Sequence, residues 1–170
     1  NGPLNLVYFP TPSYQLLQLI NDQADEWKQN YTDNAPRPIR FQCSNGVPRS
    51  HRRLVVNWLL KNNLDGVISF DKQRPLKDYE YTKFVIGFSN QGNWMAMQPF
   101  YTQCDVNIVT ETQYYECPGI ITEKTLMAVL GMQVPILIGY KGMVKRFEDL
   151  GFDAFRDVVN TEYDSLPDEI

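Results

Sequence analysis

Short apolar segments alternate with amphipathic segments along this sequence, and that alternation is the feature that most restricts its fold. Apolar runs of strand length are followed by stretches of about 10–15 residues in which apolar side chains recur at helical spacing. This order is typical of βαβ units around a parallel sheet. We therefore expect an α/β fold with a mostly parallel sheet, whose strands lie near 4–9, 39–43, 66–70, 106–110 and 135–139.

The amphipathic segments predict the helices that connect these strands. We expect helices at 13–29, 50–60, 93–101, 122–132 and 143–150. Within the helix at 50–60, one buried face is predicted by Leu54, Val55, Trp58 and Leu59. A further strand is expected at 81–87, and irregular chain is expected at 112–119.

This fold class also predicts where a ligand would bind. In open parallel sheets, ligands bind beyond the carboxyl ends of the strands, on the loops that follow them. Here those loops are 44–52, 71–83, 111–122 and 139–143.

Composition limits the protein to a few classes. A chain of 170 residues, 43% of them hydrophobic, can bury one core, so a single domain over 1–170 is expected. The net charge of −4 disfavours general nucleic-acid binding, and no apolar run approaches the ~18 residues that span a bilayer. The three cysteines, Cys43, Cys104 and Cys117, are widely spaced, which favours reduced, buried thiols in a cytoplasmic protein.

Several common site signatures are missing from the sequence. It contains neither G-x-G-x-x-G nor G-x-x-x-x-G-K-[ST], which disfavours dinucleotide dehydrogenases and P-loop enzymes. One histidine and three scattered cysteines provide no zinc-binding spacing, so no metal is expected. Cys43 and His51 are a conceivable nucleophile–base pair. A cysteine within a predicted strand is more often a core residue, and we prefer that interpretation.

The strongest local signal is Ile121-Thr-Glu-Lys124, which opens a predicted helix after a strand and a loop. Thr122 is suited to cap that helix, and the positive helix end attracts anions. Lys124 is a cation where acidic residues are usually preferred, which a bound phosphate would explain. Glu123 is suited to accept hydrogen bonds from ribose hydroxyls. The alternative is that Thr122 and Glu123 only cap the helix while Lys124 is solvated.

A second signal is the basic segment 45–53, which also lies between a strand and a helix start. It brings His51 together with Arg49, Arg52 and Arg53 in a protein that is acidic overall. Guanidinium groups match phosphate oxygens in a bidentate manner. The alternative is a solvated helix start, paired with the acidic C-terminal segment.

Two further candidates lie where the predicted strand 106–110 ends. Glu111 follows that strand directly, and Tyr114 lies in the loop that comes next. An aromatic ring at that position is suited to stack on a base or a sugar. The alternative for Tyr114 is packing over the core, which is the commoner case.

The stretch from Val106 to Gly139 resembles the donor-binding domain of α-1,3-fucosyltransferases. Those enzymes share a strand ending in Glu, a short loop, an Ile-Thr-Glu-Lys helix start and a Pro-hydrophobic-Gly strand, all of which are present here. The segments 45–53, 151–155 and 162–164 resemble a broader group of fucosyltransferase-like proteins common in phage and marine sequences. After Glu111 the sequence has Thr-Gln, where the family usually has Asn-Ser.

This resemblance implies one Rossmann-like half of a two-domain GT-B glycosyltransferase, with no metal and no cofactor apart from the donor substrate. It implies that Glu123 and Lys124 hold the ribose and phosphates of a GDP-fucose-like nucleotide sugar. It assigns the diphosphate-binding arginine to Arg49, Arg52 or Arg53. The glycan acceptor would be bound, and the catalytic base supplied, by a second domain that this chain lacks.

We therefore predict a donor-binding glycosyltransferase domain that is incomplete as an enzyme by itself. One alternative is a non-catalytic module that binds a sugar nucleotide or carbohydrate and has lost the reaction. Another is a structural α/β domain with no ligand. Binding of guanosine diphosphate separates the last alternative from the first two, and a hydrolysis assay separates those two.

Overall fold

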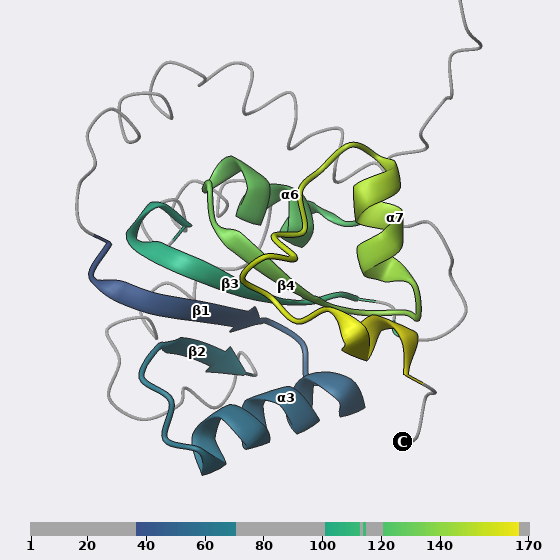
Figure 1. The fold of residues 1–170 in the computed structure, drawn as a ribbon. Helices are drawn as coiled ribbons and strands as arrows, with labels where there is room; N and C mark the ends of the chain where they lie inside the picture. The colour runs from purple at the N-terminus through teal and green to yellow at the C-terminus, as the bar shows by residue number, and fades with distance from the viewer. Residues whose placement is uncertain (1–36, 71–100, 113, 115–120, 167–170) are drawn as a thin grey trace, which may run out of the picture.

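A computed structural model describes residues 37–70, 101–112, 114 and 121–166. Within them the chain forms one sheet of four parallel strands in the order β2-β1-β3-β4 (Figure 1). The strands are β1 (Ile39–Asn45), β2 (Val67–Phe70), β3 (Cys104–Thr110) and β4 (Val134–Ile138). The predicted α/β fold with a parallel sheet is confirmed, and it is consistent with a single Rossmann-like domain. The elements expected at 4–9, 13–29 and 81–87, the loop at 71–83 and most of 93–101 lie outside the described residues.

The helices that lie wholly within the described residues occupy the positions that the sequence predicts, and residues 101–103 are also helical. They are α3 (Ser50–Lys61), α6 (Glu123–Leu130) and α7 (Met143–Asp149), and a 3-10 turn, η1 (Glu162–Ser165), follows them. In this part of the chain no helix is long and apolar enough to cross a membrane. Cys43 and Cys104 are buried, free thiols, as expected, while Cys117 lies outside the described residues.

The two described βαβ units start at the neighbouring strands β1 and β3 and extend toward opposite edges of the sheet. From β1 the chain passes through α3 to β2 on one side, and from β3 it passes through α6 to β4 on the other. Right-handed crossovers in opposite directions place their helices on opposite faces of a sheet. Figure 1 shows this, with α3 below the sheet and α6 and α7 above it. The carboxyl ends of the neighbouring strands β1 and β3 therefore form a topological switch point, which is where ligands bind in open α/β sheets.

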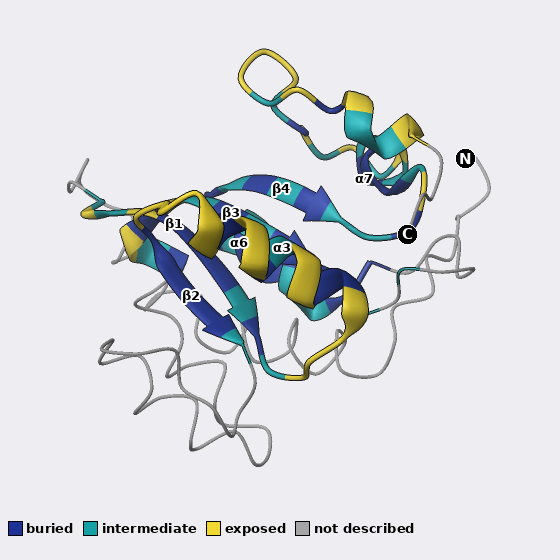
Figure 2. Ribbon diagram, turned by 90° about the horizontal axis from the view of Figure 1, so that it is seen from below, coloured by how far each residue is buried: buried dark blue, intermediate teal, exposed yellow. Residues whose placement is uncertain are grey.

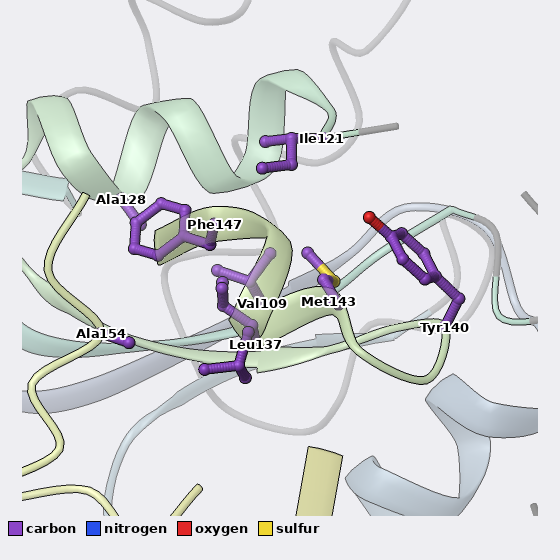
Figure 3. Packing of buried hydrophobic residues seen from close by; sticks show 9 residues of the cluster. Val109, Ile121, Ala128, Leu137, Tyr140, Met143, Phe147 and Ala154 are labelled. Atoms are coloured by element: carbon purple, nitrogen blue, oxygen red, sulfur yellow. The ribbon is translucent and has the colours of Figure 1, made fainter. Parts of the chain in front are cut away.

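Each face of the sheet carries its own apolar core. Under α3, Val56 and Leu59 pack with Cys43 and Ile68. On the opposite face, the core cluster spans β3, α6, β4 and α7 (Figure 3). Its buried members are Val109, Ile121, Ala128, Leu137, Tyr140, Met143, Val144, Phe147 and Ala154.

The buried face of α3 is rotated from the predicted one: Leu59 is buried and Val55 packs against the core as predicted, but Leu54 and Trp58 do not. Leu54 and Trp58 are 51% and 60% exposed, and exposed positions run along this helix in Figure 2. The apolar residues of this helix, Leu54, Val55, Val56, Trp58, Leu59 and Leu60, cover more than one face, so spacing alone does not select the side that packs. The face that packs is the one that brings Val56 and Leu59 against the sheet. The same rotation carries His51 and Arg52 inward.

The C-terminal segment stabilises the start of α7. The residue before this helix is Gly142, at φ 82°, and it has no side chain to cap the helix. Asp164 supplies the cap instead, because its carboxylate accepts hydrogen bonds from the amides of Val144 (3.1 Å) and Lys145 (3.4 Å). Its backbone carbonyl also accepts from the amide of Gly142 at 3.1 Å.

We expect Asp164→Ala to lower the free energy of unfolding by about 1 kcal/mol, the usual cost of removing a helix cap. Urea denaturation measures this effect. Asp157→Ala is the matched control, since it removes the same charge from an exposed position of the same segment. Equal losses in the two variants would show that the effect is one of net charge and not of capping.

Candidate functional site

Glu111 is the central residue of the carboxyl edge between β1 and β3. Its side chain is 1% exposed, yet its carboxylate is fully hydrogen-bonded. Oε1 accepts from the amide of Thr122 (3.1 Å) and the hydroxyl of Thr125 (2.7 Å). Oε2 accepts from the amide of Thr112 (3.2 Å) and the hydroxyl of Thr122 (2.5 Å). Any part that Glu111 plays in ligand binding is therefore through the residues it holds, because its oxygens face inward.

Thr122 is the N-cap of α6, as the sequence predicts. Its backbone is extended, and its hydroxyl oxygen accepts a hydrogen bond from the amide of Lys124 at 3.4 Å. The same hydroxyl donates to Glu111, so a single side chain joins the cap to the buried carboxylate. The start of α6 is thereby fixed to the end of β3.

Lys124 is turned toward the loop after β3 and is only 22% exposed. Its Nζ donates to the hydroxyl oxygen of Thr112 at 3.1 Å and to Oε1 of Glu123 at 2.6 Å. The fully solvated lysine of the alternative interpretation is therefore wrong. Lys124 and Glu123 form a half-buried ion pair at the helix start.

Arg52 reaches the same point from the other helix. It is 3% exposed, and its Nη2 donates to the carbonyl of Thr110 (3.2 Å) and the hydroxyl of Thr112 (3.4 Å). Its Nη1 donates to the carbonyl of Val47 at 3.1 Å. Nε is buried and has no hydrogen-bond partner among the described residues. Burial lowers the pKa of Arg52, and the neighbouring charge of Arg49 lowers it further, while Glu111 and Glu123 raise it.

The structure thus brings Arg52, Glu123 and Lys124 together at Thr112, although α3 and α6 lie on opposite faces of the sheet. Arg53 does not join them. It is exposed, and its Cζ lies 5.3 Å from the ring centroid of Phe70 at the end of β2.

Arg49 is exposed at the N-cap of α3 and makes no side-chain cap. It lies near enough to His51 and Arg52 for its charge to lower the pKa of both. The first turn of α3 contains no acidic residue. This helix end is therefore strongly positive and lacks a carboxylate of its own.

His51 connects the two loops of this edge. Its Nε2 lies 2.9 Å from the backbone carbonyl of Glu111, and because a carbonyl only accepts, Nε2 carries the hydrogen. The ring stacks on Tyr114, with centroids 5.1 Å apart and planes 20° apart. Burial lowers the pKa of His51, and the charges of Arg52 and Arg49 lower it further, although the hydrogen bond to Glu111 opposes them. The imidazole is therefore neutral at pH 7.

The structure does not support a Cys43–His51 nucleophile–base pair. Burial raises the pKa of Cys43 to about 12, so the reactive thiolate is absent at neutral pH. The Sγ of Cys43 accepts from Nδ2 of Asn45 at 3.3 Å, while the histidine donates to Glu111. The preferred interpretation of Cys43 as a core residue is confirmed by its complete burial.

Sequence reasoning missed Thr112, Thr125 and the bridging position of His51. Thr112 and Thr125 carry little signal, because threonine is common in strands and at helix starts and their partner Glu111 lies one and fourteen residues away. The sequence draws attention to His51 for its basic neighbours and as a conceivable partner of Cys43, but not as a contact to Glu111. Within the described residues, no three His, Cys, Asp or Glu side chains cluster in a way that would hold a metal ion.

Comparison with known proteins adds no assignment to this geometry. The chain matches no protein-family model, and no curated protein is significantly similar to it.

His51 is the chain's single histidine, so its titration is observed without overlap in tag-free protein. We expect its NMR titration midpoint below 6.5, because the pKa is lowered in the folded state. The unfolded chain then binds more protons than the folded chain as the pH falls below about 6.5, so the free energy of unfolding decreases there. His51→Gln lacks this component. A wild-type midpoint at or above 6.5 would contradict the buried, neutral imidazole.

Proposed function

We propose that this chain is the donor-binding domain of a glycosyltransferase, and that the edge between β1 and β3 binds the diphosphate of a GDP-fucose-like nucleotide sugar. The observation that carries the proposal is the meeting of Arg52 and Lys124 at the hydroxyl of Thr112. Two cations from two separate βα loops converge there at the switch point of the sheet. The family resemblance of residues 106–139 supports the same assignment.

The charge of Arg52 argues for an anion at this edge. Its guanidinium is buried, its hydrogen bonds go to neutral oxygens, and its Nε is unpartnered within the described residues. The charges of Glu111 and Glu123 act on it, but neither carboxylate is among its hydrogen-bond partners. A buried cation is costly unless an anion lies beside it. A phosphate would supply that charge and accept charge-assisted hydrogen bonds. The start of α3, which has no acidic residue, would add the favourable field of a helix N-terminus.

Lys124 and Glu123 are suited to bind two different parts of the ligand, a phosphate and the ribose. In the structure they pair with each other at 2.6 Å. When a diphosphate is bound, Lys124 turns from Glu123 to a phosphate oxygen, and Glu123 is released to accept from ribose hydroxyls. Tyr114, held beside His51, would then lie at the nucleoside side of the site.

In glycosyl transfer these residues would stabilise the departing diphosphate. As the glycosidic bond breaks, negative charge develops on the β-phosphate, and preorganised cations lower the energy of that state. A partner domain would bind the glycan acceptor and supply the catalytic base. Nucleotide-sugar binding without hydrolysis or transfer, even with such a domain supplied, would favour the non-catalytic binding module.

Lys124→Ala is expected to weaken guanosine diphosphate binding by about 10- to 150-fold, because a charge-assisted contact contributes roughly 1.5–3 kcal/mol. Isothermal titration calorimetry measures the change. Lys145→Ala is the matched control, since it removes a lysine that is 72% exposed on α7. Wild-type protein that binds no nucleotide, or equal affinities in Lys124→Ala and wild type, would contradict the proposed site.

Glu123→Ala separates recognition of the nucleoside from recognition of the anion. It is expected to weaken guanosine diphosphate binding and to leave inorganic pyrophosphate binding unchanged or slightly tighter, since it removes a ribose acceptor and frees Lys124. The same calorimetric titration, run with both ligands, gives the two affinities. An equal loss for both would mean that Glu123 acts only by orienting Lys124.

A further inference from the structure

His51 makes one contact to each of two residues in the loop after β3, although it belongs to the first turn of α3. Its Nε2–H donates to the backbone carbonyl of Glu111, and its ring stacks on Tyr114. The side chain is 5% exposed, so both contacts are made inside the protein. No other function has been assigned to it above.

The hydrogen bond from His51 ends at the residue that organises the second loop. The carbonyl that receives it belongs to Glu111, whose carboxylate holds Thr122 and Thr125 at the start of α6. A continuous path of hydrogen bonds therefore runs from α3, through His51 and Glu111, to α6. Arg52 lies at one end of this path and Lys124 at the other.

We propose that His51 is a positioning residue that sets the distance between Arg52 and Lys124 in the diphosphate site. This inference rests on the proposed function. The two cations come from helices on opposite faces of the sheet, and both donate to the hydroxyl of Thr112, so their separation depends on how α3 is held against the loop that contains Thr112. The Nε2–H of His51 joins the two loops directly, and a preorganised pair of cations loses less entropy when an anion binds.

The charges around the ring provide an independent test. From its own helix, Arg49 and Arg52 act on His51, and from the loop after β3 the groups in contact are the Glu111 carbonyl and Tyr114. On α6, Lys124 contacts Thr112 beside Arg52, and the charge of Glu123 acts on Arg52. Because Arg49 and Arg52 disfavour protonation, an anion bound to them will favour it. The titration midpoint of His51 should therefore rise when pyrophosphate binds.

Two substitutions separate the hydrogen bond from the ring. His51→Gln keeps an N–H donor near the position of Nε2 and loses the ring, whereas His51→Phe keeps a ring and loses the donor. Calorimetry with inorganic pyrophosphate should give His51→Gln an affinity within about twofold of wild type. His51→Phe should bind about fivefold more weakly, which corresponds to one lost hydrogen bond. His51→Leu repeats the second arm with a smaller side chain if the phenylalanine variant does not fold.

The outcomes distinguish this inference from the proposed function. If wild-type protein binds no pyrophosphate, the diphosphate site itself is wrong. If wild type binds it but His51→Phe and His51→Leu match wild type, or His51→Gln loses as much as they do, the site stands and the positioning role is overturned. NMR of the wild-type protein needs no variant: a His51 midpoint unchanged by saturating pyrophosphate places the anion away from Arg52, so that the diphosphate site is wrong and the positioning role falls with it.

Discussion

The arrangement of this edge of the sheet depends on one buried carboxylate. Glu111 has almost no contact with water, so its charge is tolerable only because four donors surround it. Two of those donors are backbone amides and two are threonine hydroxyls, and three of the four belong to the start of α6. The requirement to satisfy one charge thereby fixes where a helix begins. It also fixes the direction in which Lys124 leaves that helix, since the cap and the lysine share the first turn.

Arg52, on the other side of the switch point, is a buried charge whose hydrogen bonds are incomplete within the described residues. Its hydrogen bonds go to carbonyl and hydroxyl oxygens, and the carboxylates of Glu111 and Glu123 act on its charge without accepting from it. Burial lowers its pKa, yet arginine stays protonated in proteins. A saturated anion at Glu111 and an incompletely partnered cation at Arg52 therefore lie close together on one edge. This asymmetry is why we propose an anionic ligand at this edge, with Glu111 holding the residues around it in place.

The packing of α3 links the core to this edge. Val56 and Leu59 must face the sheet to cover Cys43 and Ile68, and the helical period then places His51 and Arg52 on the same side, one turn and more toward the N-terminus. The cost is that Leu54 and Trp58 face outward. The core thus determines how the basic residues are divided: Arg52 lies beneath the edge, while Arg49 and Arg53 remain exposed.

The sequence by itself determined the parallel α/β fold, the positions of the described strands and the Thr122 cap, because these depend on local apolar periodicity and on hydrogen bonds between residues near in the chain. It also selected Arg52, Glu123 and Lys124 as candidates, since residues after parallel strands share one edge. Only the tertiary structure decided which face of α3 is buried, because the apolar residues of that helix cover more of its surface than the sheet can bury. Only it decided that Arg52 is buried while Arg53 stacks on Phe70, and that His51 reaches Glu111. Those contacts join residues distant in sequence, and their geometry exists only after the sheet has assembled and its two faces have packed.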